Sequence, residues 1–148
     1  MISTAITTVE LAASLIRLFE GVRLTSYQDT GGKWTIGYGH TGPVNGIPLG
    51  FGVTLSQEDA EMFLAQDAAP LLTAVQGRPM VEAAALVSFG YNCGIMAMRG
   101  AMIGTIHPSL WIHDALGHEL PALVKRRAVE VGLMEASQQM MAHPVVAK

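Results

Sequence analysis

Between Leu24 and Val53 the sequence changes from helical to hairpin character, and this change limits the possible fold more than any other feature. Short runs such as LTSYQ and KWTIGYGH are separated there by the segments DTGG, HTGP and VNGIP. Glycine, asparagine and proline so placed are typical of tight turns between antiparallel strands. The segment therefore predicts a small antiparallel sheet of two or three short strands.

An amphipathic helix is predicted ahead of this sheet, over residues 8–20. Its apolar residues follow the i, i+4, i+7, i+8 spacing of one buried helix face, namely Leu11, Leu15, Leu18 and Phe19. Gly21 follows at once, which is a natural helix end. We expect this helix to deliver Glu20, at its C-terminus, next to the first strand.

Further helices are predicted after the sheet. Ser56 precedes Asp59 by three residues, a capping-box start to a second helix. Helical patterns then cover residues 57–75, 79–98, 109–116 and 121–135, broken at Gly77-Arg78-Pro79, Gly100 to Pro108 and Gly117. The last segment, QQMMAHPVVAK, is expected to be loosely held.

This order of elements predicts an α+β fold: a helix, a small antiparallel sheet and a helical lobe. At 148 residues, the chain has the length of one domain. We therefore expect a single domain over 1–148, with a β-rich lobe at about 22–54 and a helical lobe at about 56–135. A groove between the two lobes is the natural place for a site.

Composition excludes several classes of protein. Half of the residues are apolar, 14% are charged and the net charge is −3, which favours a compact globule without a nucleic-acid partner. The single cysteine, Cys93, cannot form an internal disulfide and is interpreted as a buried hydrophobe. The uncharged segment 83–98 has 16 residues, fewer than a membrane span needs, and predicts a buried central helix. With no evident secretion signal, we expect a soluble cytoplasmic protein.

The stretch FEGVRLTSYQDTGGKWTIGYGHT, residues 19–41, concentrates the polar residues that could carry chemistry. Cleavage of a glycosidic bond needs a proton donor and a second carboxylate, and Glu20 beside Phe19 and Asp29 in a polar turn could supply both. The Thr35 hydroxyl could hold the attacking water. Taken singly, each has an ordinary explanation: a solvated helix end, a turn former and a β-branched strand residue.

The pattern E-x8-D-x5-T, followed at once by IGYGHT, resembles the bacteriophage-type lysozymes, or endolysins. These are small muramidases that cut peptidoglycan between N-acetylmuramic acid and N-acetylglucosamine. The resemblance implies a lysozyme-like fold and places Glu20, Asp29 and Thr35 at the positions of the acid, the second carboxylate and the water-holding threonine. It covers residues 11 to about 135.

Three further segments extend the resemblance. LAQDAAP at 64–70 implies that Asp67 pairs with the hairpin residue His40, and AALVSFGYNCG at 84–94 implies that Tyr91 and Asn92 face the sugar cleft. LPALVKRRAVEVGLM at 120–134 implies an arginine near the catalytic glutamate, and either Arg126 or Arg127 could fill that role. Separately, Gly39 is expected to let the hairpin backbone approach the sugar closely.

The resemblance implies an inverting hydrolase that lyses bacterial cells by cutting the cell wall. We expect a monomer that needs no cofactor or metal, does not insert stably into a membrane and has peptidoglycan strands as its partner. It would accumulate in the host cytoplasm and reach the wall through a membrane lesion. Two alternatives of another class are a lysozyme-like module that binds peptidoglycan without cutting it and a phage structural module.

Other motifs in the sequence give weaker support to other functions. Gly37 to Gly42 formally matches the dinucleotide pattern G-x-G-x-x-G, but Gly42-Pro43 denies it the helix it needs. The spacings of His107, His113 and His118 do not place imidazoles on one helix face for a metal. Cys93 has no electropositive sequence neighbour that would make it a nucleophile. Lys125-Arg126-Arg127 is too small a cluster for a nucleic-acid recognition helix.

Overall fold

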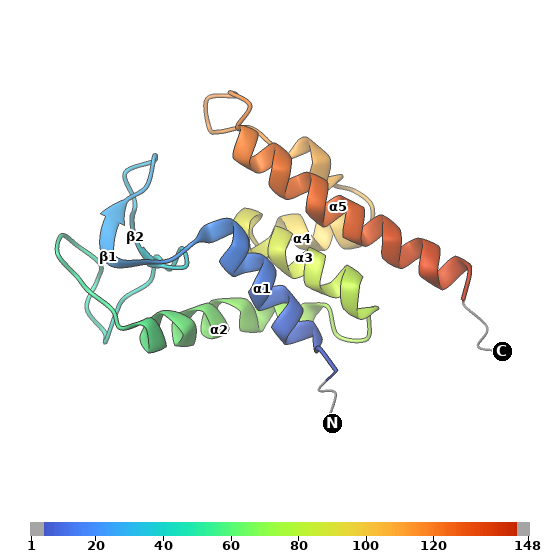
Figure 1. The fold of residues 1–148 in the computed structure, drawn as a ribbon. Helices are drawn as coiled ribbons and strands as arrows, with labels where there is room; N and C mark the ends of the chain where they lie inside the picture. The colour runs from blue at the N-terminus through green and yellow to red at the C-terminus, as the bar shows by residue number, and fades with distance from the viewer. Residues whose placement is uncertain (1–4, 145–148) are drawn as a thin grey trace.

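The computed structural model of the protein describes residues 5–144, and it has an α+β fold, as the sequence predicts (Figure 1). A two-stranded hairpin lies at one end of the molecule and the helices at the other. The elements are, in order, α1 (Thr8–Glu20), β1 (Arg23–Gln28), β2 (Trp34–Gly37), α2 (Gln57–Ala74), α3 (Met80–Cys93), α4 (Ile95–Met102), the 3-10 helix η1 (Pro108–Leu110) and α5 (Pro121–Ala142).

Helix α1 has the predicted bounds, because its two ends are capped. Thr7 and Glu10 form a complete capping box at the start, and Gly21, with φ of 64°, ends the helix. Three of the four predicted apolar residues face the core: Leu15 is buried, and Leu11 and Phe19 are partly buried against it. Ala12 and Ile16 are buried beside them. Leu18 is 70% exposed, because the side of α1 that packs against α3 is turned away from it.

The sheet has two strands, β1 and β2, paired antiparallel with Tyr27 opposite Thr35. The register is irregular between Arg23 and Tyr27. The segment after the hairpin returns to β1 only through an isolated bridge between Thr25 and Thr54, so it does not make a third strand.

Helix α3 is the core of the helical lobe and packs against α1, α2, α4 and α5. Its central residues, Ala83 to Gly90, are all buried, which agrees with the predicted central helix. The predicted helix over 79–98 is divided in two, because Gly94 has φ of 90° and separates α3 from α4. At α2, Ser56 accepts a hydrogen bond from the Asp59 backbone, one half of the predicted capping box.

The predicted helix over 109–116 is wrong: the segment holds the end of η1 and a turn. The Asp114 carboxylate accepts hydrogen bonds from the backbone of Leu116 and His118, which satisfies these groups outside a helix. The C-terminal segment is more ordered than predicted, because α5 continues to Ala142. Residues 145–148 of that segment lie outside the described residues.

Within residues 5–144, no helix is both long enough and apolar enough to cross a membrane.

Two helical glycines allow a test of the packing around α3. A Cβ atom on Gly90 would lie 2.8 Å from Met98 Sδ and 3.0 Å from Leu71 Cδ2, whereas one on Gly132 in α5 would meet nothing within 4 Å. Gly90→Ala should lower the free energy of unfolding by about 1–3 kcal/mol through overpacking. Gly132→Ala should raise it by up to about 1 kcal/mol, because alanine favours the helix. Urea unfolding of both variants checks this, and equal effects would contradict the packing described.

Candidate active site

Glu20 is brought to the site by the end of α1. Gly21 stops the helix at this residue, so the Glu20 side chain projects toward the hairpin, and it remains 22% exposed. A Cβ atom on Gly39 would lie 3.4 Å from Glu20 Oε2, which shows how closely the hairpin backbone approaches the carboxyl. On its other side, Glu20 Oε1 accepts a hydrogen bond from Arg126 Nη1.

Asp29 occupies the turn between β1 and β2, and backbone groups hold its side chain. Its Oδ1 accepts hydrogen bonds from the backbone N–H of Gly31 at 2.9 Å and of Lys33 at 2.8 Å. Both bonds fall on one oxygen, so Oδ2 is the oxygen that can accept a hydrogen bond from a water. The residue is exposed, as a group that must meet a substrate has to be.

Thr35 lies on β2, and the same turn that holds Asp29 orients its hydroxyl. The Lys33 carbonyl accepts from the Asp29 backbone N–H at 2.9 Å and from Thr35 Oγ1 at 3.1 Å. Because the Thr35 hydroxyl donates its proton there, its oxygen can accept a hydrogen bond from another molecule. One carbonyl therefore connects the two hairpin residues.

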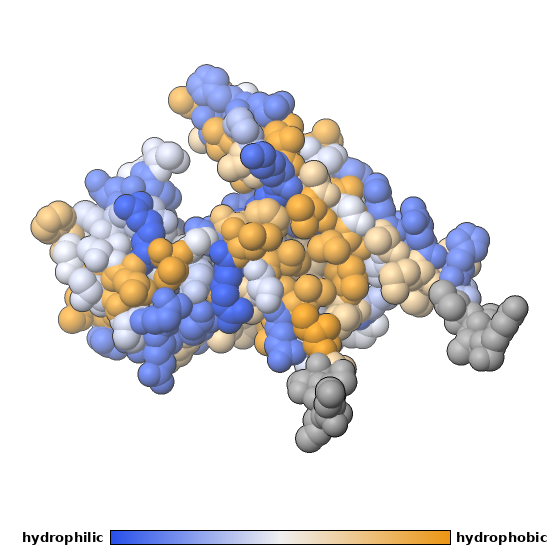
Figure 2. Space-filling model, viewed as in Figure 1, coloured by the Kyte–Doolittle hydropathy of each residue, from blue (hydrophilic) through white to orange (hydrophobic). Residues whose placement is uncertain are grey.

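These residues line one cleft of about 250 Å³ between the hairpin and the helices. Figure 2 shows the hollow that separates the hairpin lobe from the N-terminal end of α5. Six residues expected from the sequence meet there: Glu20, Asp29, Thr35, Gly39, Tyr91 and Asn92. A second hollow, of about 470 Å³, shares Gly39, Thr41 and Tyr91 with the first, so the two adjoin at these residues.

Sequence reasoning missed two lining residues, Tyr27 and Thr41. Tyr27 is the cross-strand partner of Thr35, so both side chains emerge on the same face of the hairpin. Strand alternation could therefore have identified Tyr27. Arg23 lies over its ring at 4.0 Å and holds the ring in place.

His40 and Asp67 form the pair that the resemblance implies. His40 Nδ1 lies 2.8 Å from Asp67 Oδ2, and the imidazole stacks on the Phe63 ring with centroids 4.2 Å apart. The His40 and Ile36 backbones also exchange two hydrogen bonds across the turn that carries Gly39. The pair thus anchors the glycine turn to α2, and no helix begins at this turn, contrary to what the dinucleotide motif requires.

The structure shows which of the two arginines lies next to Glu20, a choice that the sequence left open. Arg126 is the neighbour of Glu20, whereas Arg127 donates to Asn92 Oδ1 at 2.7 Å. Both are almost fully buried, at 4% and 1% exposed, so neither is available to a phosphate backbone.

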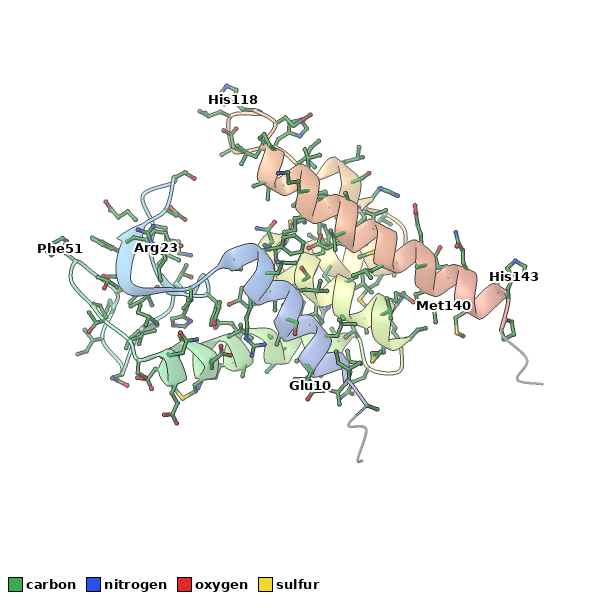
Figure 3. All side chains as sticks on the ribbon, in the orientation of Figure 1. Glu10, Arg23, Phe51, His118, Met140 and His143 are labelled. Atoms are coloured by element: carbon green, nitrogen blue, oxygen red, sulfur yellow. The ribbon has the colours of Figure 1, made fainter. Side chains whose placement is uncertain are left out.

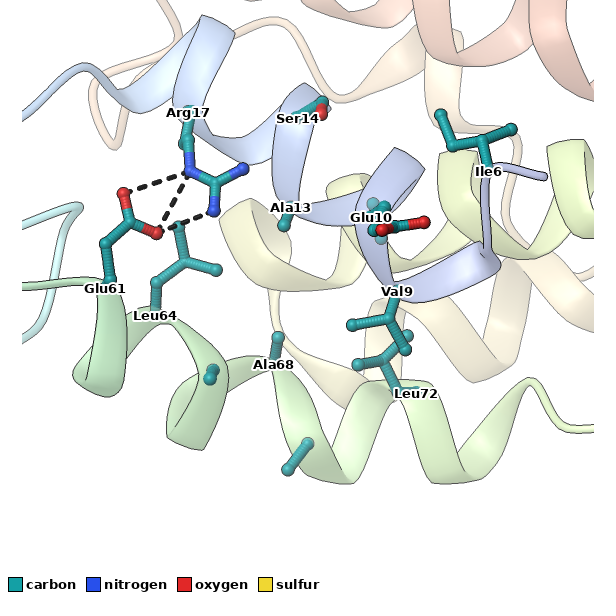
Figure 4. A pocket seen from close by; sticks show the side chains of 13 residues that line it. Ile6, Val9, Glu10, Ala13, Ser14, Arg17, Glu61, Leu64, Ala68 and Leu72 are labelled. Atoms are coloured by element: carbon teal, nitrogen blue, oxygen red, sulfur yellow. Dashed lines mark hydrogen bonds and ion pairs between the residues drawn. The ribbon is translucent and has the colours of Figure 1, made fainter. Parts of the chain in front are cut away.

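A larger hollow, of about 550 Å³, lies between α1 and α2, away from this cleft (Figure 4). Its lining is mostly alanine, leucine and valine, with two carboxylates. Glu61 is bound by Arg17 and Tyr38, and Glu10 belongs to the α1 capping box. Both carboxylates already have structural partners, so the smaller polar cleft is the better candidate for chemistry.

The histidines near α5 are engaged separately. His118 lies in the loop ahead of α5 (Figure 3), with its Nδ1 3.1 Å from Asp114 Oδ2. His107 Nδ1 lies 2.6 Å from Ser109 Oγ. In the part of the chain that the structure describes, no three His, Cys, Asp or Glu side chains are grouped closely enough to hold a metal ion.

The fold, with two carboxyl residues in one groove between a hairpin and a helical lobe, is that of a small glycoside hydrolase. The sequence model of the phage lysozyme family matches residues 17–130, and the chain belongs to this family.

Similar proteins of known sequence or structure support this family assignment. The endolysin of Acyrthosiphon pisum secondary endosymbiont phage 1 is 31% identical, over 83% of this chain and 94% of its own. The endolysin from Escherichia coli O157:H7 phage FAHEc1 matches in structure with a TM-score of 0.68 and 29% identity, over 84% of this chain and 90% of that one. The muramidase domain of SpmX from Asticaccaulis excentricus matches with a TM-score of 0.65 and 31% identity, over 83% and 93%.

One inference about Cys93 is corrected by the structure. The thiol does have an electropositive neighbour, because Arg127 Nη1 lies 3.1 Å from Cys93 Sγ. Burial nevertheless raises the pKa of the Cys93 thiol, and the opposing effect of Arg127 is smaller. The thiol therefore stays protonated, and a nucleophilic role has no support.

The raised pKa predicts slow chemical modification of Cys93. Only the thiolate reacts, so at about pH 8.5, the ordinary pKa of a cysteine, iodoacetamide should modify the native protein several-fold more slowly than the urea-unfolded protein. The difference should shrink as the pH rises through the raised pKa and the native thiol ionises. Mass spectrometry of timed samples measures both rates, and equal rates near pH 8.5 would contradict a protonated thiol.

Proposed function

We propose that this protein is an endolysin that hydrolyses the β-1,4 bond between N-acetylmuramic acid and N-acetylglucosamine in peptidoglycan, with inversion at the anomeric carbon. The observation that carries the proposal is the meeting of Glu20, Asp29 and Thr35 in one cleft. The relatives named above, two endolysins and a muramidase domain, support the substrate class.

The hairpin geometry supports a water-activating role for Asp29 and Thr35. A water that donates one proton to Asp29 Oδ2 and the other to Thr35 Oγ1 keeps a lone pair free for attack. The bonds from Gly31, Lys33 and the Lys33 carbonyl fix both acceptors, so this water is oriented before the substrate arrives. Asp29 then takes the proton that the attacking water loses.

Glu20 is the proposed general acid. As the water oxygen bonds to the anomeric carbon, the glycosidic C–O bond breaks and Glu20 protonates the departing oxygen. Attack from the face opposite the leaving group inverts a β bond to an α product. The second hollow, which adjoins the cleft at Gly39 and Tyr91, offers space for further sugar units of a polymer.

The biological setting follows from this activity. The protein acts on the bacterial cell wall as a monomer, and we infer that it accumulates in the host cytoplasm until a membrane lesion gives it access to the wall. Cleavage of the wall polymer into short fragments then lyses the cell. The competing hypothesis, a peptidoglycan-binding module without activity, is an outcome of the first test below.

Removal of the proposed acid is the first test. Glu20→Gln should lower the release of reducing ends from purified peptidoglycan by about 10²–10⁴-fold, the usual contribution of a general acid. Glu135→Gln, the same change at an exposed residue of α5, is the matched control and should retain activity. A folded wild type that binds peptidoglycan but releases nothing would replace this proposal with the binding module.

The stereochemistry of the product tests the roles of Asp29 and Thr35. Proton NMR of a freshly cleaved glycan should show the α anomer first, before mutarotation mixes the two forms. Asp29→Asn and Thr35→Val should both slow the reaction, because each removes an acceptor for the attacking water. Early appearance of the β anomer would instead indicate a retaining enzyme with a covalent intermediate.

Comparing substitutions at two glycines with positive φ distinguishes the effect of backbone strain from the effect of site geometry. Gly39 has φ of 88° and Gly52 has φ of 77°, but only Gly39 lies against Glu20. Gly39→Ala and Gly52→Ala should both destabilise the fold by about 1 kcal/mol, the cost of a side chain in this conformation. Only Gly39→Ala should also lose most of the hydrolytic rate, because its methyl group would occupy the space beside the Glu20 carboxyl, 3.4 Å from Oε2, where the sugar must bind. Similar activity in the two folded variants would disprove this role for Gly39.

A further inference from the structure

A row of four charged side chains runs from the cleft into the protein, where α1, α3 and α5 lie side by side (Figure 1). The row is Glu20, Arg126, Glu130 and Arg127. Glu130 is 0% exposed, which is rare for a carboxylate, and no step of the proposed reaction uses it. Such a group needs an explanation, because burying a charge is costly unless its partners are well placed.

One branch of the row leads from Glu130 to the proposed acid. Glu130 Oε1 lies 3.0 Å from Arg126 Nε, and Arg126 Nη1 donates to Glu20. The third nitrogen, Nη2, donates to the Ser88 carbonyl at 2.9 Å, so all three nitrogens of this guanidinium are engaged. Arg126 therefore has a single orientation, and Glu130 and Glu20 share its charge.

The other branch leads to the wall of the groove. Arg127 Nε lies 3.0 Å from Glu130 Oε2, although the two are not aligned as a hydrogen bond. Arg127 Nη2 donates to Asn92 Oδ1, and its guanidinium lies over the Phe89 ring at 4.9 Å. Because Asn92 lines the cleft, the position of its amide depends on Arg127 and, through it, on Glu130.

The sharing of Arg126 between Glu20 and Glu130 affects how readily Glu20 keeps its proton. A cation touching Glu20 favours the ionised carboxylate, but a general acid must carry its proton. Glu130 is a second negative charge beside the same guanidinium. Protonated Glu20 therefore faces a smaller excess of positive charge than it would with Arg126 alone. The groups that face Glu130 are Ser88 of α3, which donates to Oε1 at 2.7 Å, and the two arginines of α5.

We propose that Glu130 is a positioning residue for this reaction: it balances the charge of Arg126 so that Glu20 can hold its proton, and it holds Arg127 so that the Asn92 amide faces the sugar. The inference rests on the proposed function, because it takes Glu20 as the acid. Burial raises the pKa of Glu130 above its ordinary value, and the opposing effects of Ser88 and the two arginines are smaller. The charge balance rests instead on geometry, because an arginine nitrogen lies 3.0 Å from each carboxylate oxygen of Glu130.

Glu130→Gln tests both branches. With Arg126 balanced by Glu20 alone, the alkaline limb of the kcat/KM profile should move to lower pH, because the proton of the acid is lost earlier. KM should rise roughly fivefold, the effect of losing about one hydrogen bond at Asn92. Glu135→Gln removes the same charge from an exposed position of α5 and should change neither quantity. A titration of 13C-labelled Glu20 by NMR should show the same downward shift of its midpoint.

A second variant covers the case in which Glu130→Gln does not fold. Glu130→Gln/Arg127→Gln removes one charge of each sign from the buried row, and it should give the same two effects. Its control is Lys125→Gln/Glu135→Gln, at exposed residues of the same helix. A folded variant with an unmoved alkaline limb, or with unchanged KM, would overturn the inference and leave Glu130 a purely structural residue. The NMR titration needs no turnover, so it judges the charge balance even if the wild type cleaves no peptidoglycan.

Discussion

The burial of Glu130 between two arginines is the interaction on which the arrangement of the site depends. An unpaired buried charge costs several kcal/mol, so α5 can pack on α3 only in the position that gives Glu130, Arg126 and Arg127 their partners. That position brings Arg126 to Glu20 on α1 and Arg127 to Asn92 at the end of α3. Helix α5 is thus fixed against both helices that form the inner wall of the cleft.

Stability alone is a poor explanation for such a cluster. Well-packed apolar residues of similar volume often replace a buried ion pair without loss, and sometimes with a gain of about 1–4 kcal/mol. A charged row also orients groups at a distance, which an apolar core does not do. Its two ends lie at the proposed acid and at a cleft amide, so positioning explains its presence better than stabilisation does.

The outer wall of the cleft depends on local backbone geometry instead. The Lys33 carbonyl holds Asp29 and Thr35 within one turn, and the His40–Asp67 pair anchors the next turn to α2. These contacts join residues that are close in sequence, except for the one to Asp67. The site therefore has two walls of different origin, one set by hairpin turns and one by helix packing.

This difference explains how much could be predicted. The bounds of α1, the α+β order and the residues of the hairpin are determined by caps, turns and spacing, and all were readable in the sequence. The helix expected over 109–116 failed because the Asp114 side chain competes for backbone groups there. The continuous helix expected over 79–98 failed because Gly94 adopts a positive φ, which the helical pattern does not reveal. Both errors concern single side-chain or backbone choices that periodicity does not report.

The partner of Glu20 was beyond sequence reasoning for a different reason. Arg126 is 106 residues away, and its neighbour Arg127 has the same chemistry. Successive residues on a helix point about 100° apart, so the rotation of α5 decides which arginine meets Glu20 and which meets Asn92. Glu130 lies four residues after Arg126 and three after Arg127, the two spacings that let its carboxylate meet both arginines. The R-R-x-x-E pattern thus encodes a buried charge cluster, and the packing of α5 on α3 determines which arginine contacts Glu20 and which contacts Asn92.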